Sequence, residues 1–192
     1  MPAPPLILAS ASPRRKELLK LIGVTPDEII PADIDETECA GEKPAAYVSR
    51  LAQEKARHVA KANPRAFVLG SDTAVACGRR ILPKAEDERT ARICLALLSG
   101  RSHRVFSGVA LVKPDGEILS KVSETRVKVR RLDHNAIDEY IDCGEWSGKA
   151  GGYAIQGVFA KHIVTMLGSH SNVVGLPLYE TSNLLTGAGW RK

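Results

Sequence analysis

The stretch Leu6–Lys16 reads LILASASPRRK and passes from a strand pattern into the start of a helix. Leu6–Leu8 is a short apolar run of the kind that a buried strand uses. Ser12 is placed to cap a following helix, and the proline after it suits the first turn. The next three residues, Arg14–Lys16, are cations in the first turn, where positive charge interacts unfavourably with the helix dipole. The segment predicts an anion-binding helix start, and a solvated basic helix end fits it equally well.

Outward from this stretch, strand and helix patterns alternate along the chain. Strands are predicted at residues 28–31, 67–70 and 163–167, helices at 13–22, 44–62, 87–98, 135–143 and 178–185, and a strand pair over 101–129 with a turn at 113–116. Early alternation with a hairpin in the middle predicts an α/β fold with a mixed sheet. A length of 192 residues suits one domain, or one with a small lobe.

The composition excludes several classes of function. A formal charge of +5 suits binding of phosphorylated ligands but is too small to indicate nucleic-acid binding. Aromatic residues make up only 5% of the chain, which weakens the case for stacking of bases along a single strand. The four cysteines form no CxxC pair, which disfavours structural zinc and favours reduced thiols in a cytoplasmic protein. No stretch approaches the ~20 apolar residues of a membrane span, so we expect no membrane association.

Carboxylates are the first candidates for chemistry. Asp33, Asp35, Glu36 and Asp72 are hard oxygen donors of the type that Mg²⁺ or Mn²⁺ takes when it also holds phosphates. Asp72 follows the predicted strand at 67–70 and precedes another apolar run, so it is expected at or inside a buried sheet. A buried carboxylate needs a metal or a paired cation. Both interpretations of Asp72 stay open here.

Three further features are ambiguous when each is taken singly. Lys55 and Lys84 read as solvated lysines. The segment Gly148–Gly157 holds four glycines in ten residues, matches neither a Walker A loop nor a GxGxxG fingerprint, and reads as a flexible loop. Within it, Gln156 offers a donor and an acceptor that can match one edge of a nucleobase, or it is a surface amide.

A basic strand is predicted near residue 128. Arg126, Lys128 and Arg130 alternate with valines and therefore share one strand face. This pattern favours a solvated sheet edge over a nucleic-acid surface. No serine stands in a nucleophile-elbow context, so covalent hydrolase chemistry is unsupported.

Together these segments resemble the Maf family of nucleoside triphosphate pyrophosphatases. The resemblance runs from about Leu6 to Leu185. Its eight segments arrive in family order: Leu8–Arg15, Asp33–Glu36, Glu54–Ala56, Ser71–Thr73, Lys84, Ser99–Arg101, Lys149–Gly157 and Asn172–Pro177.

The resemblance implies a fold, a reaction and a set of site residues. The fold would be Maf/inosine-triphosphatase-like, a single domain over residues 1–192 with a mixed central sheet flanked by helices and a cleft between two lobes. The reaction would convert a nucleoside triphosphate to the monophosphate and pyrophosphate with a divalent cation, Mg²⁺ or Mn²⁺. Asp72 matches the general base, and Glu36 and Asp72 match metal ligands. The matching substrate-binding residues are Ser10, Arg14, Arg15, Lys55, Thr73, Lys84 and Gln156. A homodimer and a link to cell-division arrest are further implications.

The family resemblance also bears on base choice. One branch acts on dTTP and UTP and another on 7-methyl-GTP. Arg15, Thr73 and the stretch Tyr153–Gln156 look like the first branch, which associates Arg14, Thr73 and Gln156 with base choice. Two departures are that Pro83–Ala85 replaces the more usual Gly-Lys-Pro and that Ala154 stands where glycine is common. The alternatives are a 7-methyl-GTP pyrophosphatase, a phosphatase that releases orthophosphate, and a non-catalytic nucleotide-binding septation regulator.

Overall fold

The computed structural model describes residues 3–191, which form two compact units. The first unit comprises residues 3–72, 107–123 and 175–191, and the second comprises residues 73–106 and 124–174. Strands β3 (Phe67–Cys77), β6 (Ser102–Val112) and β7 (Ile118–Val129) contribute residues to both units.

The other elements are short apart from one long helix. In chain order they are β1 (Leu6–Ala9), α1 (Pro13–Leu21), β2 (Glu28–Ile29), α2 (Pro44–Ala62), β4 (Arg80–Leu82), β5 (Lys84–Ala85), α3 (Glu88–Leu98), α4 (His134–Asp142), β8 (Lys149–Ala150), the 3₁₀ helix η1 (Val158–His162), β9 (Ile163–Leu167), α5 (His170–Val174) and α6 (Leu178–Gly187).

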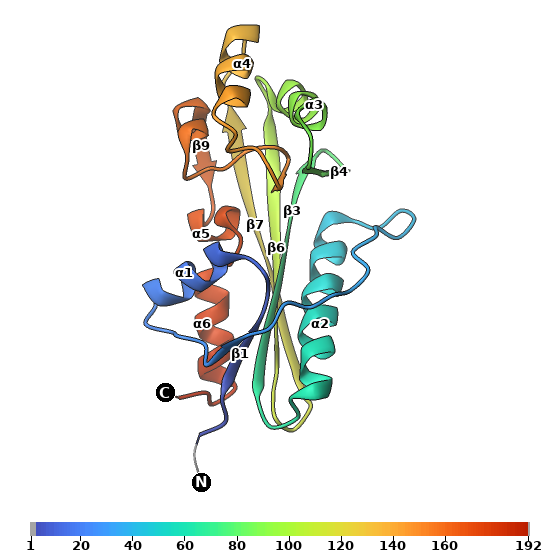
Figure 1. Ribbon diagram of the computed structural model, residues 1–192, viewed down its shortest axis with the longest axis vertical. Coiled ribbons are helices and arrows are strands. Elements are labelled where there is room, and N and C mark those ends of the chain that lie inside the picture. The colour runs from blue at the N-terminus through green and yellow to red at the C-terminus, as the bar shows by residue number, and fades with distance from the viewer. Residues whose placement is uncertain (1–2, 192) are drawn as a thin grey trace. The chain divides into compact units, whose positions relative to one another are not determined.

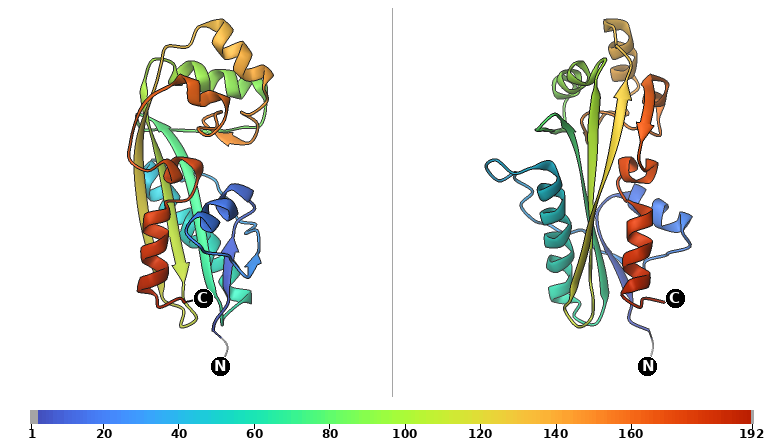
Figure 2. Two further views of the ribbon diagram at one scale, coloured as in Figure 1. Left: turned by 90° about the vertical axis from the view of Figure 1, so that its left-hand side faces the viewer. Right: turned by 180° about the vertical axis from the view of Figure 1, so that it is seen from behind.

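In the first unit, β1 lies between β2 and β3 and pairs in parallel with both. Strands β6 and β7 follow β3 in the sheet. Helix α2 lies on one side of these strands and α6 on the other, as both Figure 1 and the rear view of Figure 2 show. Apolar residues of α2, among them Ala52, Ala56 and Val59, pack with β1, β3 and β6 in a buried cluster. Helix α2 is therefore fixed directly over the strand that carries Asp72.

Two glycines set how closely α2 approaches the sheet. A Cβ atom at Gly70 would overlap the main-chain oxygen of Ala52 and lie 2.8 Å from the nitrogen of Ala56. A Cβ atom at Gly108, on the neighbouring strand, would overlap the main-chain oxygen of Val48. The helix backbone thus rests on the strand backbones, which glycine alone permits.

In the second unit, β9 pairs antiparallel with β7, and β4 pairs antiparallel with β3. The pairing of β5 with β8 forms a separate two-stranded sheet. Helices α3 and α4 lie side by side, where Arg92 of α3 bonds to Asp138 of α4. A core of buried aromatic side chains, Tyr140, Tyr153 and Phe159, closes this unit.

The predicted mixed α/β sheet is confirmed, with three local corrections. The strand predicted at 67–70 runs on to Cys77, because the apolar pattern resumes after Thr73, so Asp72 lies inside the strand. Ser12 is the N-cap of α1, but its side chain makes no cap hydrogen bond, and its N–H donates to Ser10 Oγ instead. Arg126 and Lys128 lie on β7, which is not an edge because β9 pairs with it, and Arg130 follows the end of the strand.

Within residues 3–191, no helix has the length and apolar character needed to cross a membrane.

Candidate functional site

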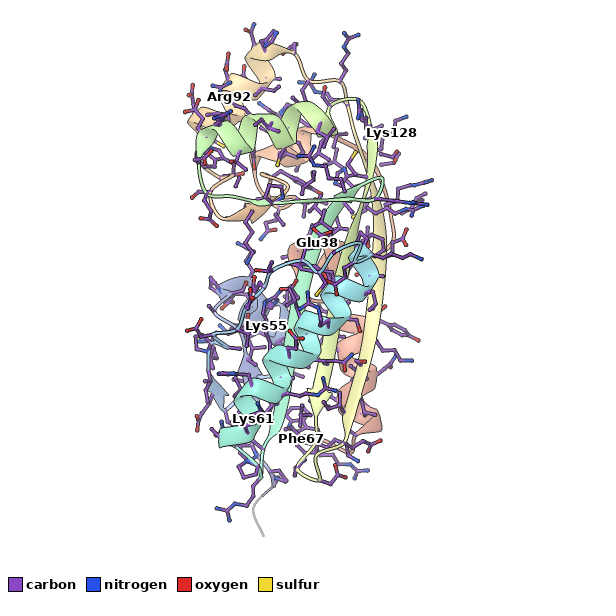
Figure 3. All side chains as sticks on the ribbon, turned by 90° about the vertical axis from the view of Figure 1, so that its right-hand side faces the viewer. Glu38, Lys55, Lys61, Phe67, Arg92 and Lys128 are labelled. Atoms are coloured by element: carbon purple, nitrogen blue, oxygen red, sulfur yellow. The ribbon has the colours of Figure 1, made fainter. Side chains whose placement is uncertain are left out.

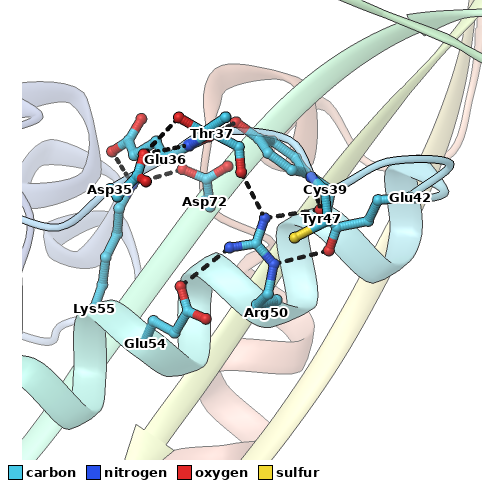
Figure 4. A network of polar contacts seen from close by, with 10 residues as sticks. All are labelled: Asp35, Glu36, Thr37, Cys39, Glu42, Tyr47, Arg50, Glu54, Lys55 and Asp72. Atoms are coloured by element: carbon cyan, nitrogen blue, oxygen red, sulfur yellow. Dashed lines mark hydrogen bonds and ion pairs between the residues drawn. The ribbon is translucent and has the colours of Figure 1, made fainter.

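The centre of the site is a lysine held by two carboxylates in the first unit. Lys55 Nζ lies 2.6 Å from Asp72 Oδ1 and 2.7 Å from Glu36 Oε1 (Figure 4). Asp72 and Lys55 are buried, and Glu36 is one-third exposed. The ammonium offsets the cost of burying the Asp72 carboxylate, so the paired-cation interpretation of Asp72 holds in this structure.

Lys55 taken singly reads as solvated, and that prediction is wrong. Lys55 lies midway along α2, whereas Lys61 is exposed in the last turn, as the labels in Figure 3 show. Leu51, Ala52 and Ala56, neighbours of Lys55 on the helix, are fully buried. This spacing puts Lys55 on the sheet-facing side of α2, and it is the sequence signal that would have corrected the prediction.

Arg15 adds a second cation to this cluster. Its Nη1 donates to Ser10 Oγ at 3.0 Å, and its Nε donates to the main-chain oxygen of Gly175 at 2.8 Å. Burial lowers the pKa of Arg15, while the charge of Asp72 opposes that shift. Arg15, from the stretch Leu6–Lys16, therefore interacts electrostatically with the carboxylates of Asp72 and Glu36.

Arg14 is half-buried next to Arg15, and burial lowers its pKa. The structure thus gathers Ser10, Arg15, Glu36, Lys55 and Asp72, with Arg14 beside them in sequence. These are six of the residues singled out by the family resemblance. A buried aspartate, a buried lysine and two arginines form a setting that suits a phosphorylated ligand.

The remaining predicted site residues belong to the second unit. Thr73 is half-buried directly after Asp72 in β3, and Lys84 and Gln156 are exposed. Lys84 lies on β5, opposite Ala150 of β8. Main-chain bonds from Gly148 to the oxygen of Ala85 and from Gly151 to the oxygen of Pro83 join the segment around Lys84 to the glycine-rich segment. Within the second unit, these two predicted elements are therefore directly connected.

The glycine-rich segment is not the flexible loop that its composition predicts. Tyr153 Oη lies 2.7 Å from His103 Nε2, the Ala154 N–H donates to Tyr140 Oη, and the Val158 N–H donates to Glu145 Oε2. Burial raises the pKa values of Tyr140 and Tyr153, so both hydroxyls stay protonated. His103, Tyr140 and Glu145 all lie outside the segment, so its composition alone does not predict these contacts.

The acidic segment, residues 33–42, has two partners that the sequence did not single out as functional. Tyr47 Oη donates to the main-chain oxygen of Glu36, and Arg50 Nη2 donates to that of Thr37. Both come from the first two turns of α2 (Figure 4). Their spacing of three residues on a helix that follows an acidic run is a signal that could have found them.

The residues described in 3–191 include no group of three or more His, Cys, Asp or Glu side chains arranged to hold a metal ion. Glu36 lies on a loop and Asp72 on β3, and both carboxylates contact the ammonium of Lys55. The two carboxylates are therefore neighbours. Mg²⁺ is commonly held by one or two carboxylates together with substrate phosphates and water. The donor set fits a cation of that kind that arrives with a phosphorylated ligand.

A mixed α/β sheet with a buried lysine between two carboxylates, flanked by arginines, defines an α/β protein suited to phosphate chemistry. A family model described as Maf-like protein matches residues 5–188. The chain belongs to the Maf family.

Curated relatives are similar over nearly the whole chain, and a solved structure has a similar fold. The chain is 55% identical over 188 residues to a dTTP/UTP pyrophosphatase of Caulobacter vibrioides, covering 98% of this chain and 97% of the relative. It is 56% identical to a dTTP/UTP pyrophosphatase of Novosphingobium aromaticivorans, covering 97% and 92%. A HAM1 protein from Coxiella burnetii matches the fold with a TM-score of 0.54 at 18% identity, covering 95% of this chain and 98% of that chain.

Proposed function

We propose that this protein hydrolyses nucleoside triphosphates, preferring dTTP and UTP, to the monophosphate and pyrophosphate. The observation that carries the proposal is the buried Asp72–Lys55 pair in a chain 55% identical to a dTTP/UTP pyrophosphatase over nearly its whole length. A buried carboxylate beside cations is a suitable base for water attack on a bound polyphosphate.

The proposed reaction begins with charge compensation. A triphosphate carries about four negative charges, which must be offset before a nucleophile approaches phosphorus. Arg14, Arg15, Lys55 and Lys84 are the proposed cationic groups, and the Ser10 hydroxyl is a proposed donor. Water attacks the α-phosphorus, the bond to the bridging oxygen of the β-phosphate breaks, and pyrophosphate leaves. Asp72 accepts the proton from the attacking water.

A divalent cation, Mg²⁺ or Mn²⁺, belongs to this proposal. Glu36 and Asp72 are the residues that would hold it. When bound, such a cation supplies neutralisation of the phosphate charge that the side chains leave uncompensated. The proximity of the two carboxylates at Lys55 supports this assignment.

Base choice is assigned to Gln156, with Arg14 and Thr73. The Gln156 amide can accept from N3–H of uracil or thymine and donate to O4, a combination that cytosine and purines do not offer in the same way. The exposure of Gln156 on a segment fixed by Tyr153 and Val158 supports its availability to a ligand. A cytoplasmic location, a homodimer and a single two-lobed domain remain predictions.

The test is a substrate panel with both products identified. Purified protein is incubated with Mg²⁺ or Mn²⁺ and each common NTP and dNTP, together with 7-methyl-GTP. The Asp72→Asn variant, prepared in parallel, controls for contaminating hydrolases. We expect pyrophosphate and monophosphate, fastest from dTTP and UTP. Faster hydrolysis of 7-methyl-GTP, release of orthophosphate, or binding without turnover would each replace the proposal with the corresponding alternative.

A further inference from the structure

The acidic segment, residues 33–42, needs contacts that hold its backbone in place. It forms no helix or strand, and most of its residues are exposed. Yet Glu36 reaches Lys55 Nζ at 2.7 Å while one-third of its own side chain remains in solvent. A partly exposed ion pair contributes little by itself against the conformational entropy of a loop. Other contacts must therefore hold the segment.

Tyr47 and Arg50 make such contacts from α2, and they bind the segment by its backbone. Tyr47 Oη donates to the oxygen of Glu36 at 2.9 Å, and Arg50 Nη2 donates to the oxygen of Thr37 at 3.1 Å. The two carbonyls belong to consecutive residues, so together they fix the peptide that carries the Glu36 side chain. Figure 4 shows the side chains of Tyr47 and Arg50 extending from α2 toward this peptide.

Arg50 also fixes the far end of the segment. Its Nε and Nη2 bind the two oxygens of Glu42 at 2.8 and 2.7 Å, and Glu42 Oε2 accepts the N–H of Cys39 at 3.1 Å. A further bond joins Arg50 Nη1 to Glu54. The planar guanidinium thereby binds a carboxylate in bidentate fashion and a carbonyl at once, which the single ammonium of lysine does not reproduce.

Tyr47 and Arg50 also contact each other. The Arg50 guanidinium lies 5.6 Å from the Tyr47 ring centroid, so the two side chains also stabilise one another.

We propose that Tyr47 and Arg50 are positioning residues that hold the Glu36 carboxylate at Lys55 through the main-chain oxygens of Glu36 and Thr37. The functional part of this inference rests on the proposed role of Glu36. In the proposed reaction they have no contact with substrate or reacting atoms, and they act through the acidic segment. Loss of either contact releases the peptide of Glu36 while leaving the Lys55–Asp72 pair in place.

The first test measures the segment itself by hydrogen–deuterium exchange of residues 35–42, without nucleotide. In Tyr47→Phe and Arg50→Lys, exchange of these amides should accelerate by about tenfold or more while α2 stays protected. Tyr179→Phe on α6 and Arg57→Lys on α2 are matched controls, since Tyr179 is exposed and Arg57 donates to Gln53 within its own helix. Unchanged exchange in the variants, or an unprotected segment in the wild type, overturns the inference.

The second test is a double-mutant comparison of turnover. Tyr47→Phe and Arg50→Lys should each lower pyrophosphate release by about 10–100-fold, the range measured when a ligand's supporting bond is lost. In a Glu36→Gln background they should cause little further loss, because the group they position is already gone. Equal losses in both backgrounds contradict the inference. If the wild type hydrolyses no nucleotide, the proposed function is wrong. Faster exchange in the variants of that protein would still support the positioning role.

Discussion

Lys55 Nζ and Asp72 Oδ1 lie 2.6 Å apart, with side-chain exposures of 8% and 7%. Since 17 residues separate them in sequence, the contact exists because α2 packs on β3. The ion pair stabilises the first unit, and the same two side chains are proposed to act in the hydrolysis.

Removing the ammonium should destabilise the protein. Lys55→Met leaves the Asp72 carboxylate buried without this cation, at a cost of about 3–5 kcal/mol in the free energy of unfolding. Urea denaturation at neutral pH measures it. Lys61→Met, at an exposed position in the last turn of the same helix, is the control and should have little effect. A loss below about 1 kcal/mol for Lys55→Met would show that Asp72 does not depend on this partner.

Replacing the carboxylate should abolish activity and preserve the fold. Asp72→Asn keeps the shape of the side chain and an oxygen for Lys55, while Glu36 continues to pair with the ammonium. Pyrophosphate release from dTTP should fall by about 10²-fold or more, the scale of a lost general base. Asp33→Asn, an exposed change in the acidic segment, is the comparison. Near-normal turnover of Asp72→Asn would remove Asp72 from the mechanism.

A methyl group at Gly70 should disturb both stability and activity. Gly70→Ala drives a Cβ into the main chain of Ala52 and Ala56, and such overpacking costs about 1–3 kcal/mol. Displacement of α2 also moves Lys55, so turnover should fall as well. Gly187→Ala, at the end of α6 with nothing within 4 Å of its added Cβ, should be neutral in both assays. Equal unfolding midpoints for Gly70→Ala and the wild type would contradict this packing.

Stability should fall in mild acid because of His103. Burial lowers its pKa from 6.5 to about 4, so between these values the unfolded chain binds a proton that the folded protein does not. Stability therefore rises with pH across this window and is lost as the pH falls from about 6.5 toward 4, by roughly 3 kcal/mol in total. The pKa of His162 is also lowered, mainly by burial, and acts in the same direction.

Urea midpoints between pH 4.5 and 7 measure this effect, and His103→Gln should flatten the profile. His58→Gln, on the exposed face of α2, is the control. An equally steep profile in His103→Gln would assign the acid sensitivity to other groups.

Base preference should depend on Gln156. Gln156→Ala removes the amide proposed to read the uracil or thymine edge, so the preference for dTTP and UTP over dCTP and dGTP should narrow by about 10-fold or more. Values of kcat/KM for the four nucleotides measure the change. Gln53→Ala on α2 serves as the control. An unchanged preference in Gln156→Ala would move base recognition elsewhere.

Sequence patterns predicted the elements well where the cause is local. The helix 44–62 follows from apolar periodicity that ends at Asn63-Pro64, and it matches α2. The sequence does not predict the partners of Asp72, because they come from α2 and from a loop, and no local pattern shows a contact over such separations. The order of the glycine-rich segment depends likewise on Tyr140 and His103, which lie outside it. The family resemblance predicts the site residues, and the structure supplies their contacts within each unit.

The backbone contact of α2 with Gly70 and Gly108 has an evolutionary consequence. Main-chain atoms rather than side chains set the distance between α2 and β3. The apolar residues around the helix can therefore vary in size without changing the distance between the Lys55 ammonium and the Asp72 carboxylate. Homologous chains should accordingly vary freely at positions such as Val59 and Val112 while the two glycines stay invariant.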